Sequence, residues 1–113
     1  MKFHNWCLNT YKDGKGDDKT VCASLYSPKS GILLEVFTNE PGIQVYTGNF
    51  QGTGIACKHG IKYPKHVSVC FESQKYPDSP TKIAQGVKDW TDATLKPGEK
   101  YYSHLVYKFS VKK

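Results

Sequence analysis

Short runs of alternating apolar and polar residues, separated by proline and glycine, constrain the fold of this chain more than any other feature. Side chains two residues apart lie on the same face of a strand, so this alternation predicts half-buried β-strands. No helical apolar pattern of useful length survives the proline, glycine and aspartate content of residues 77–99. We expect strands at residues 3–8, 21–26, 32–38, 43–47, 67–76 and 100–111.

Turns and longer loops connect these predicted strands. A turn at residues 27–31, with proline and glycine, joins two of them into a hairpin. Residues 12–18 and 51–66 are polar and rich in glycine, and we interpret both as loops. Strands connected in this way, with no convincing helix between them, predict an all-β fold of antiparallel sheets, packed as a sandwich.

Length and charge narrow the functional classes. The chain of 113 residues suffices for one domain. Its net charge of +6 comes from 16 basic residues, all lysine, without the arginine that dominates recognition of phosphate and guanine. The lysines are spread along the chain, so we interpret them as a solvated surface and expect no nucleic-acid partner. No stretch approaches the ~18 apolar residues of a membrane span, and no signal peptide opens the chain, so we expect a cytoplasmic protein without a membrane partner.

Four cysteines, Cys7, Cys22, Cys57 and Cys70, show no C-x-x-C spacing. A cytosolic compartment would keep them reduced, and we interpret them as small buried hydrophobes. The alternative is a zinc site, because residues 57, 59, 66 and 70 supply two cysteines and two histidines in a short span. Their spacing matches no standard zinc signature, so we expect no metal.

The segment 67–78 contains the most informative carboxylate. Val67, Val69 and Phe71 alternate with residues that include Glu72, so we expect a buried strand with Glu72 on the face opposite the apolar set. Pro77 ends the strand, which leaves Glu72 just before an irregular segment. A stiff strand followed by a loop is a common support for a catalytic group. The strand alone equally allows a solvated surface glutamate.

Three separated motifs identify a family resemblance. They are the segment 34–50, which includes Pro-Gly-Ile-Gln-Val-Tyr-Thr-Gly-Asn-Phe, the segment 70–79, which begins Cys-Phe-Glu-Ser-Gln, and Leu-x-Pro-Gly-Glu-x-Tyr at 95–101. A fourth motif is His-Asn-Trp at 4–6, with Leu8. Together they resemble the aldose 1-epimerases, or galactose mutarotases. The family fold is a β-supersandwich much longer than this chain, so residues 1–113 resemble its C-terminal part.

The resemblance implies a sugar site without a metal or cofactor. The family interconverts the α and β anomers of free aldoses such as galactose and glucose. Its general base falls on Glu72, and a glutamine that contacts sugar hydroxyls falls on Gln44. Mutarotation needs a base at the anomeric hydroxyl and an acid at the ring oxygen, so a carboxylate and an amide suit the base and the binding tasks.

Two family features have no counterpart here. The family's general acid is a histidine from a segment upstream of these motifs, and His4, His59, His66 and His104 match non-catalytic positions. Phe3 stands where relatives carry a sugar-binding aspartate. We therefore expect the chain to lack the general acid. The alternative is a non-catalytic carbohydrate-binding or protein-interaction module that self-associates through exposed sheet edges.

Overall fold

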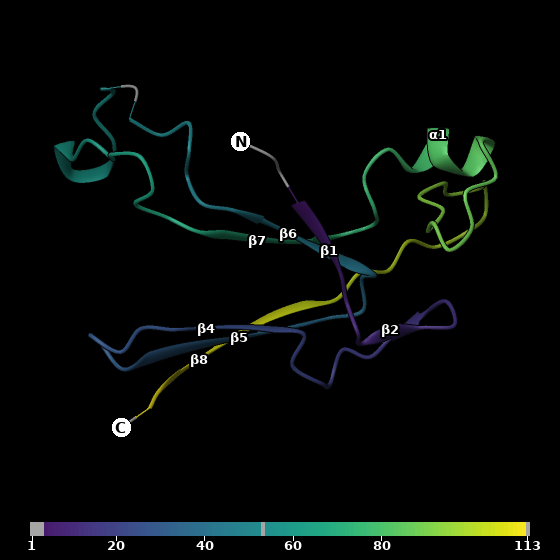
Figure 1. The fold of residues 1–113 in the computed structure, drawn as a ribbon, viewed down its shortest axis with the longest axis horizontal. Coiled ribbons are helices and arrows are strands. Elements are labelled where there is room, and N and C mark those ends of the chain that lie inside the picture. Colours follow the sequence, from purple (N-terminus) through teal and green to yellow (C-terminus); the bar gives the residue numbers. More distant parts are fainter. Residues whose placement is uncertain (1–3, 53, 113) are drawn as a thin grey trace.

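The computed structural model describes residues 4–52 and 54–112, and it is nearly all β (Figure 1). Its elements, in chain order, are β1 (His4–Cys7), β2 (Tyr11–Lys12), β3 (Lys15–Gly16), β4 (Ala23–Tyr26), β5 (Ile32–Thr38), β6 (Gly42–Tyr46), the 3₁₀ turn η1 (Lys58–Gly60), β7 (Cys70–Gln74), α1 (Ser79–Ala84) and β8 (Leu105–Val111). All strand pairs are antiparallel. The all-β antiparallel fold class is therefore confirmed.

Two three-stranded sheets face each other as layers. One has the order β1-β6-β7 and the other β4-β5-β8, while β2 and β3 form a separate hairpin. Figure 1 shows the two sheets as an upper and a lower layer. The consecutive strands β5 and β6 are each the central strand of their sheet, so the connection between them carries the chain from one layer to the other.

A small core lies between the layers beside this connection. Val36 on β5 is 0% exposed and Ile43 on β6 is 3% exposed, and Leu8 joins them. Phe71 on β7 and Leu34 on β5 pack against this cluster. The alternation that predicted these strands therefore turns one apolar face of each sheet toward the other.

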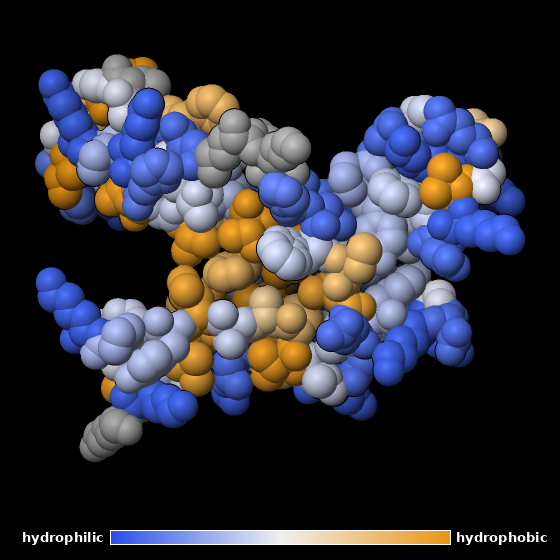
Figure 2. All heavy atoms as spheres, in the orientation of Figure 1, coloured by the Kyte–Doolittle hydropathy of each residue, from blue (hydrophilic) through white to orange (hydrophobic). Residues whose placement is uncertain are grey.

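Beyond this core the inner faces remain open. Val111, Phe109 and Tyr107 on β8 lie opposite residues 32, 34 and 36 of β5, so they share the face of buried Val36. Phe109 is nevertheless 67% exposed. Figure 2 shows apolar atoms gathered in the gap between the layers. The chain exposes 8591 Å², against about 6,200 Å² for a compact protein of its mass.

Several sequence-based expectations need correction. Of the strand expected at 67–76, only Cys70–Gln74 forms a strand, β7. The expected burial is also wrong, because Val67 and Val69 are exposed and Glu72 faces solvent. The strand expected at 100–111 begins only at Leu105. The segment 77–99 does contain a short helix, α1, because Pro80 lies in its first turn, where a missing N–H costs nothing.

Two expected loops contain local structure, and the cysteines are not buried. Residues 12–18 form the β2–β3 hairpin, in which Asp13 and Gly14 have φ of 50° and 76°, as a two-residue turn of this kind requires. The loop 51–66 contains η1. Cys7, Cys57 and Cys70 are exposed, while Cys22 is partly buried and packs against the core.

No helix in residues 4–52 and 54–112 has the length and apolar character that crossing a membrane requires.

The backbone contact at Gly16 gives a test of the fold. A Cβ added at Gly16 would lie 2.2 Å from the Asn39 carbonyl oxygen and 2.4 Å from its carbon. Gly16→Ala should therefore push the β2–β3 hairpin away from the β5–β6 connection and lower the free energy of unfolding by about 1–3 kcal/mol. Chemical denaturation would measure this change. The exposed neighbour Lys15 supplies the control, since Lys15→Ala should stay within about 0.5 kcal/mol of the parent. Equal stability of Gly16→Ala and the parent would contradict the contact.

Candidate functional site

One row of polar side chains crosses the sheet β1-β6-β7. Asn5 on β1 lies opposite Gln44 on β6, and Gln44 lies opposite Glu72 on β7. Directly opposed residues of antiparallel strands project from the same face. Gln44 and Glu72 therefore share a sheet face, although their roles remain predictions. We call residues 5, 44 and 72 the polar row.

The polar row lies on the outer face of this sheet. The neighbouring row places Ile43 opposite Ser73 and Trp6, and Ile43 belongs to the core between the layers. Period-two alternation therefore turns Gln44 and Glu72 away from the core. Gln44 is half-buried and Glu72 is exposed. Neither residue lines any of the four cavities found among the described residues.

Asn5 was not among the predicted site residues. Its Oδ1 is buried and has no hydrogen-bond partner among the described residues. A Cβ at Gly42 would lie 2.6 Å from Asn5 Nδ2 and 3.0 Å from the Tyr76 ring, so the missing side chain of Gly42 leaves the space that the Asn5 amide occupies. The alternation of residues in β1 places Asn5 on one face of that strand. The sequence does not show that Asn5 lies opposite Gln44, because that depends on the pairing register of β1 and β6.

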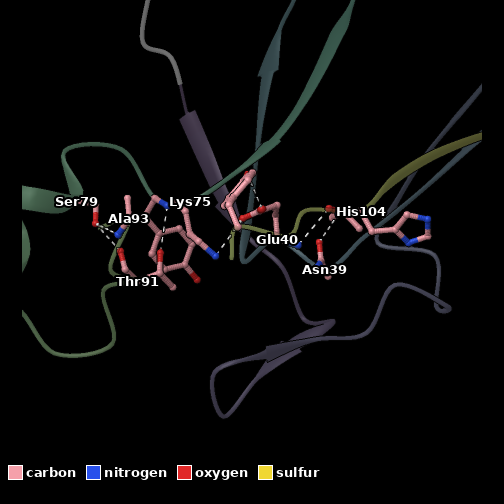
Figure 3. A network of polar contacts seen from close by, with 10 residues as sticks. Asn39, Glu40, Lys75, Ser79, Thr91, Ala93 and His104 are labelled. Carbon is pink, nitrogen blue, oxygen red and sulfur yellow. Dashed lines mark hydrogen bonds and ion pairs between the residues drawn. The ribbon is translucent and has the colours of Figure 1, made fainter. Parts of the chain in front are cut away.

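A buried polar network fixes the far end of β7 (Figure 3). Glu40, in the β5–β6 connection, is 2% exposed. Its Oε2 lies 3.4 Å from Lys75 Nζ, and its Oε1 accepts a hydrogen bond of 3.4 Å from the Tyr101 hydroxyl. A buried carboxylate is tolerated when it is paired in this way. Because Lys75 follows three residues after Glu72, the network holds the strand that carries Glu72.

The same connection holds the start of β8. The backbone N–H of His104 donates to Asn39 Oδ1 at 2.8 Å, and the Asn39 N–H donates to the His104 carbonyl oxygen at 3.3 Å. The imidazole of His104 is paired as well, since its Nδ1 lies 2.6 Å from Asp18 Oδ2. These contacts tie both layers to residues 39–40.

Of the four histidines, only His4 lies in the sheet that carries the polar row. His4 lies opposite Val45, which places it on the inner face of β1. His66 contacts the Thr47 carbonyl oxygen, His104 pairs with Asp18, and His59 lies in η1. Phe3, which replaces the family's aspartate, lies outside the described residues. Within the part of the chain that the structure describes, no histidine stands ready as an acid beside Glu72.

The zinc alternative is not supported. Among the described residues, no three side chains of histidine, cysteine, aspartate or glutamate come together as a metal would require. Cys57 and Cys70 lie in different elements, and both are exposed.

Two tyrosines next to the row have perturbed pKa values. Burial, followed by contact with the Cys7 thiol, raises the pKa of Tyr76 to about 12. Burial also raises the pKa of Tyr107, with smaller effects from Cys70 and from the charge of Glu72. The Tyr107 hydroxyl donates to the Phe71 carbonyl oxygen, which links β8 to β7. Both phenols are therefore neutral at physiological pH and act as hydrogen-bonding groups rather than bases.

Comparison with known proteins identifies the family. The family model described as aldose 1-epimerase matches residues 1–108. Galactose mutarotase from Mus musculus is 41% identical over 108 residues, which cover 96% of this chain and 29% of that protein. Aldose 1-epimerase from Escherichia coli is 36% identical over 97 residues, covering 84% of this chain and 26% of that protein.

A solved structure agrees with the sequence match. An aldose epimerase homologue from C. elegans superposes with a TM-score of 0.71 at 27% identity, over 94% of this chain and 29% of that one. The chain thus spans less than a third of the length of the relatives that it matches. The match covers nearly all of its own residues, so this chain belongs to the aldose 1-epimerase family.

Proposed function

We propose that the polar row is the base-bearing part of an aldose 1-epimerase site, which interconverts the α and β anomers of an aldose such as galactose or glucose. Glu72 is the general base and Gln44 binds sugar hydroxyls. The observation that carries the proposal is the register that sets Gln44 opposite Glu72 on one face. The reaction is inferred from the family to which the chain belongs. The shared face would let one sugar contact both side chains.

The chemistry requires two proton transfers. The Glu72 carboxylate takes the proton of the anomeric hydroxyl, while an acid protonates the ring oxygen and the bond between that oxygen and C1 breaks. The open aldehyde then rotates and closes on its other face. Gln44 offers two N–H donors and a carbonyl acceptor, which match a pair of neighbouring hydroxyls. These contacts would hold the sugar while its ring opens.

The acid must come from elsewhere. No described histidine of the sheet β1-β6-β7 lies on the face of the polar row, and the chain spans 29% of the length of the mouse relative. We propose that residues 1–113 act as the C-terminal part of an aldose 1-epimerase-like domain and that polypeptide outside them supplies the acid. The open inner faces support this proposal, because a larger domain would cover them.

Removing the base should abolish most of the mutarotation. The chain is joined to the part of mouse galactose mutarotase that it does not match, and polarimetry follows freshly dissolved α-D-galactose. The joined protein should be faster than the chain alone. Glu72→Gln keeps the shape but cannot accept the proton, so the rate should fall by about 10²- to 10⁴-fold.

A second carboxylate provides the control for this measurement. Glu35 on β5 lies in the sheet that does not carry the polar row, and its carboxylate is 3.2 Å from Lys108 Nζ on the neighbouring strand β8, so Glu35→Gln should leave the rate unchanged. A rate that Glu72→Gln leaves intact would contradict the assignment of the base. Galactose binding that Gln44→Ala weakens, without any catalysed rate in the joined protein, would instead favour the non-catalytic binding module.

Asn5 should support Gln44 in sugar binding. The Asn5 amide fills the space over Gly42, beside Gln44. Removing this amide would leave an empty space next to the Gln44 side chain. Asn5→Ala should therefore weaken galactose binding about fivefold, which corresponds to about 1 kcal/mol, as measured by side-chain amide shifts of Gln44 in an NMR titration. Gly42→Ala should act in the same direction, because its Cβ displaces the Asn5 amide. Ser24→Ala, at an exposed position on β4, is the control; equal binding by Asn5→Ala and this control would exclude Asn5 from the site.

A further inference from the structure

A cavity of about 420 Å³ has none of the polar-row residues in its lining. It opens between the β2–β3 hairpin and the segment 76–91, which lie at the same end of the molecule (Figure 1). We call it the aromatic pocket. Its lining residues are Tyr11, Asp13, Gly14, Tyr76, Asp89, Trp90 and Thr91.

Three aromatic rings line this pocket, and two of them are held in place. The rings of Tyr76 and Trp90 meet edge to face, with centroids 5.4 Å apart and planes at 67°. Trp90 Nε1 donates to the Pro77 carbonyl oxygen at 3.2 Å, and the Tyr76 N–H donates to Thr91 Oγ1 at 3.3 Å. These bonds fix the orientation of the indole and the backbone beneath the phenol. The pocket therefore offers aromatic surface at little cost in side-chain ordering.

The charge of the lining is opposite to that of the chain. Two lining residues, Asp13 and Asp89, are carboxylates, and none is a lysine, although the chain carries 16 lysines and a net charge of +6. Neither carboxylate takes part in the ion pairs found among the described residues. Asp89 also contributes, behind burial and the Cys7 thiol, to raising the pKa of Tyr76. The Asp89 carboxylate therefore lies near the Tyr76 phenol.

The charged groups of the pocket lining only accept hydrogen bonds. The Trp90 N–H is already donated to Pro77. The Thr91 hydroxyl receives the Tyr76 N–H. Two carboxylates without a basic partner favour a ligand that brings positive charge, with or without N–H donors. Positive charge over the faces of Trp and Tyr is attracted by their ring quadrupoles, and nearby carboxylates add to that attraction.

We propose that the aromatic pocket binds an organic cation, through its ammonium or guanidinium group, against Trp90, Tyr76 and the two carboxylates. The group belongs either to a small free amine or to a lysine or arginine side chain of another polypeptide segment. This site is separate from the polar row and does not depend on the proposed epimerase activity.

Binding can be measured with two probes on the whole chain. Choline represents a small free cation, and arginine amide represents a guanidinium side chain. In a Trp6→Phe background, Trp90 is the only tryptophan, so its fluorescence reports on the pocket. Either probe should change the emission in a saturable way at constant ionic strength. Preference for choline would indicate a small free amine, and preference for arginine amide a side-chain ligand.

Charge removal is the decisive arm of the experiment. Asp89→Asn and Asp13→Asn should each weaken binding about tenfold, because each removes one facing carboxylate. Asp78→Asn is a matched control: residue 78 has φ of 57°, close to 50° at residue 13 and 63° at residue 89, but it does not line the pocket. Asparagine tolerates this conformation as aspartate does, so Asp78→Asn should bind like the parent.

Three results would overturn the proposal. They are an emission change that does not saturate, unchanged binding in both Asp89→Asn and Asp13→Asn, and binding of D-galactose that competes with choline at equal concentration. Glu72→Gln should bind choline like the parent, although it should lose mutarotation in the joined protein. The cation-binding proposal and the epimerase proposal can therefore fail independently.

Discussion

The three residues between β5 and β6 carry the chain from one sheet to the other, and both layers depend on them. Asn39 bonds the backbone at the start of β8, Glu40 is buried against Lys75 and Tyr101, and Pro41 is fully buried. A carboxylate at 2% exposure is costly unless it is paired, so this crossing forms only when the segments that contribute its partners are in place. The polar network therefore couples three distant stretches of sequence.

This crossing also determines where the polar row lies. β6 begins at Gly42, directly after Pro41, and Gln44 follows two residues later on the same face. Glu72 precedes Lys75 by three residues on the strand that pairs with β6. A shift of one residue in either strand would turn its polar side chain to the core, so the buried anchor at Glu40 protects the register. The buried anchor at Glu40 and the proposed sugar-binding residue Gln44 thus lie within five consecutive residues.

The sequence predicted the features that depend on local pattern. The bounds of β5 were correct, and period two correctly placed Glu72 on the face opposite Phe71, which packs against the core. Helix α1 was missed because Pro80 was weighed as a helix breaker, although the first turn tolerates it. Whether a buried strand is covered depends on the opposing layer, and this explains why Cys70 is exposed. Asn5 was missed because only the β1–β6 register links it to Gln44.

The position of β5 and β6 at the centre of their sheets has a consequence for backbone opening. Each is paired on both sides, β5 over residues 33–36 and β6 over residues 42–45, and the two strands are consecutive in the chain. Successive N–H groups of a central strand point to alternate neighbours, so complete exchange along β5 or β6 requires both flanking strands to separate, whereas β1, β4, β7 and β8 are released from one side. Deuterium would enter these two strands last, and the slowest exchange would follow the crossing between the layers.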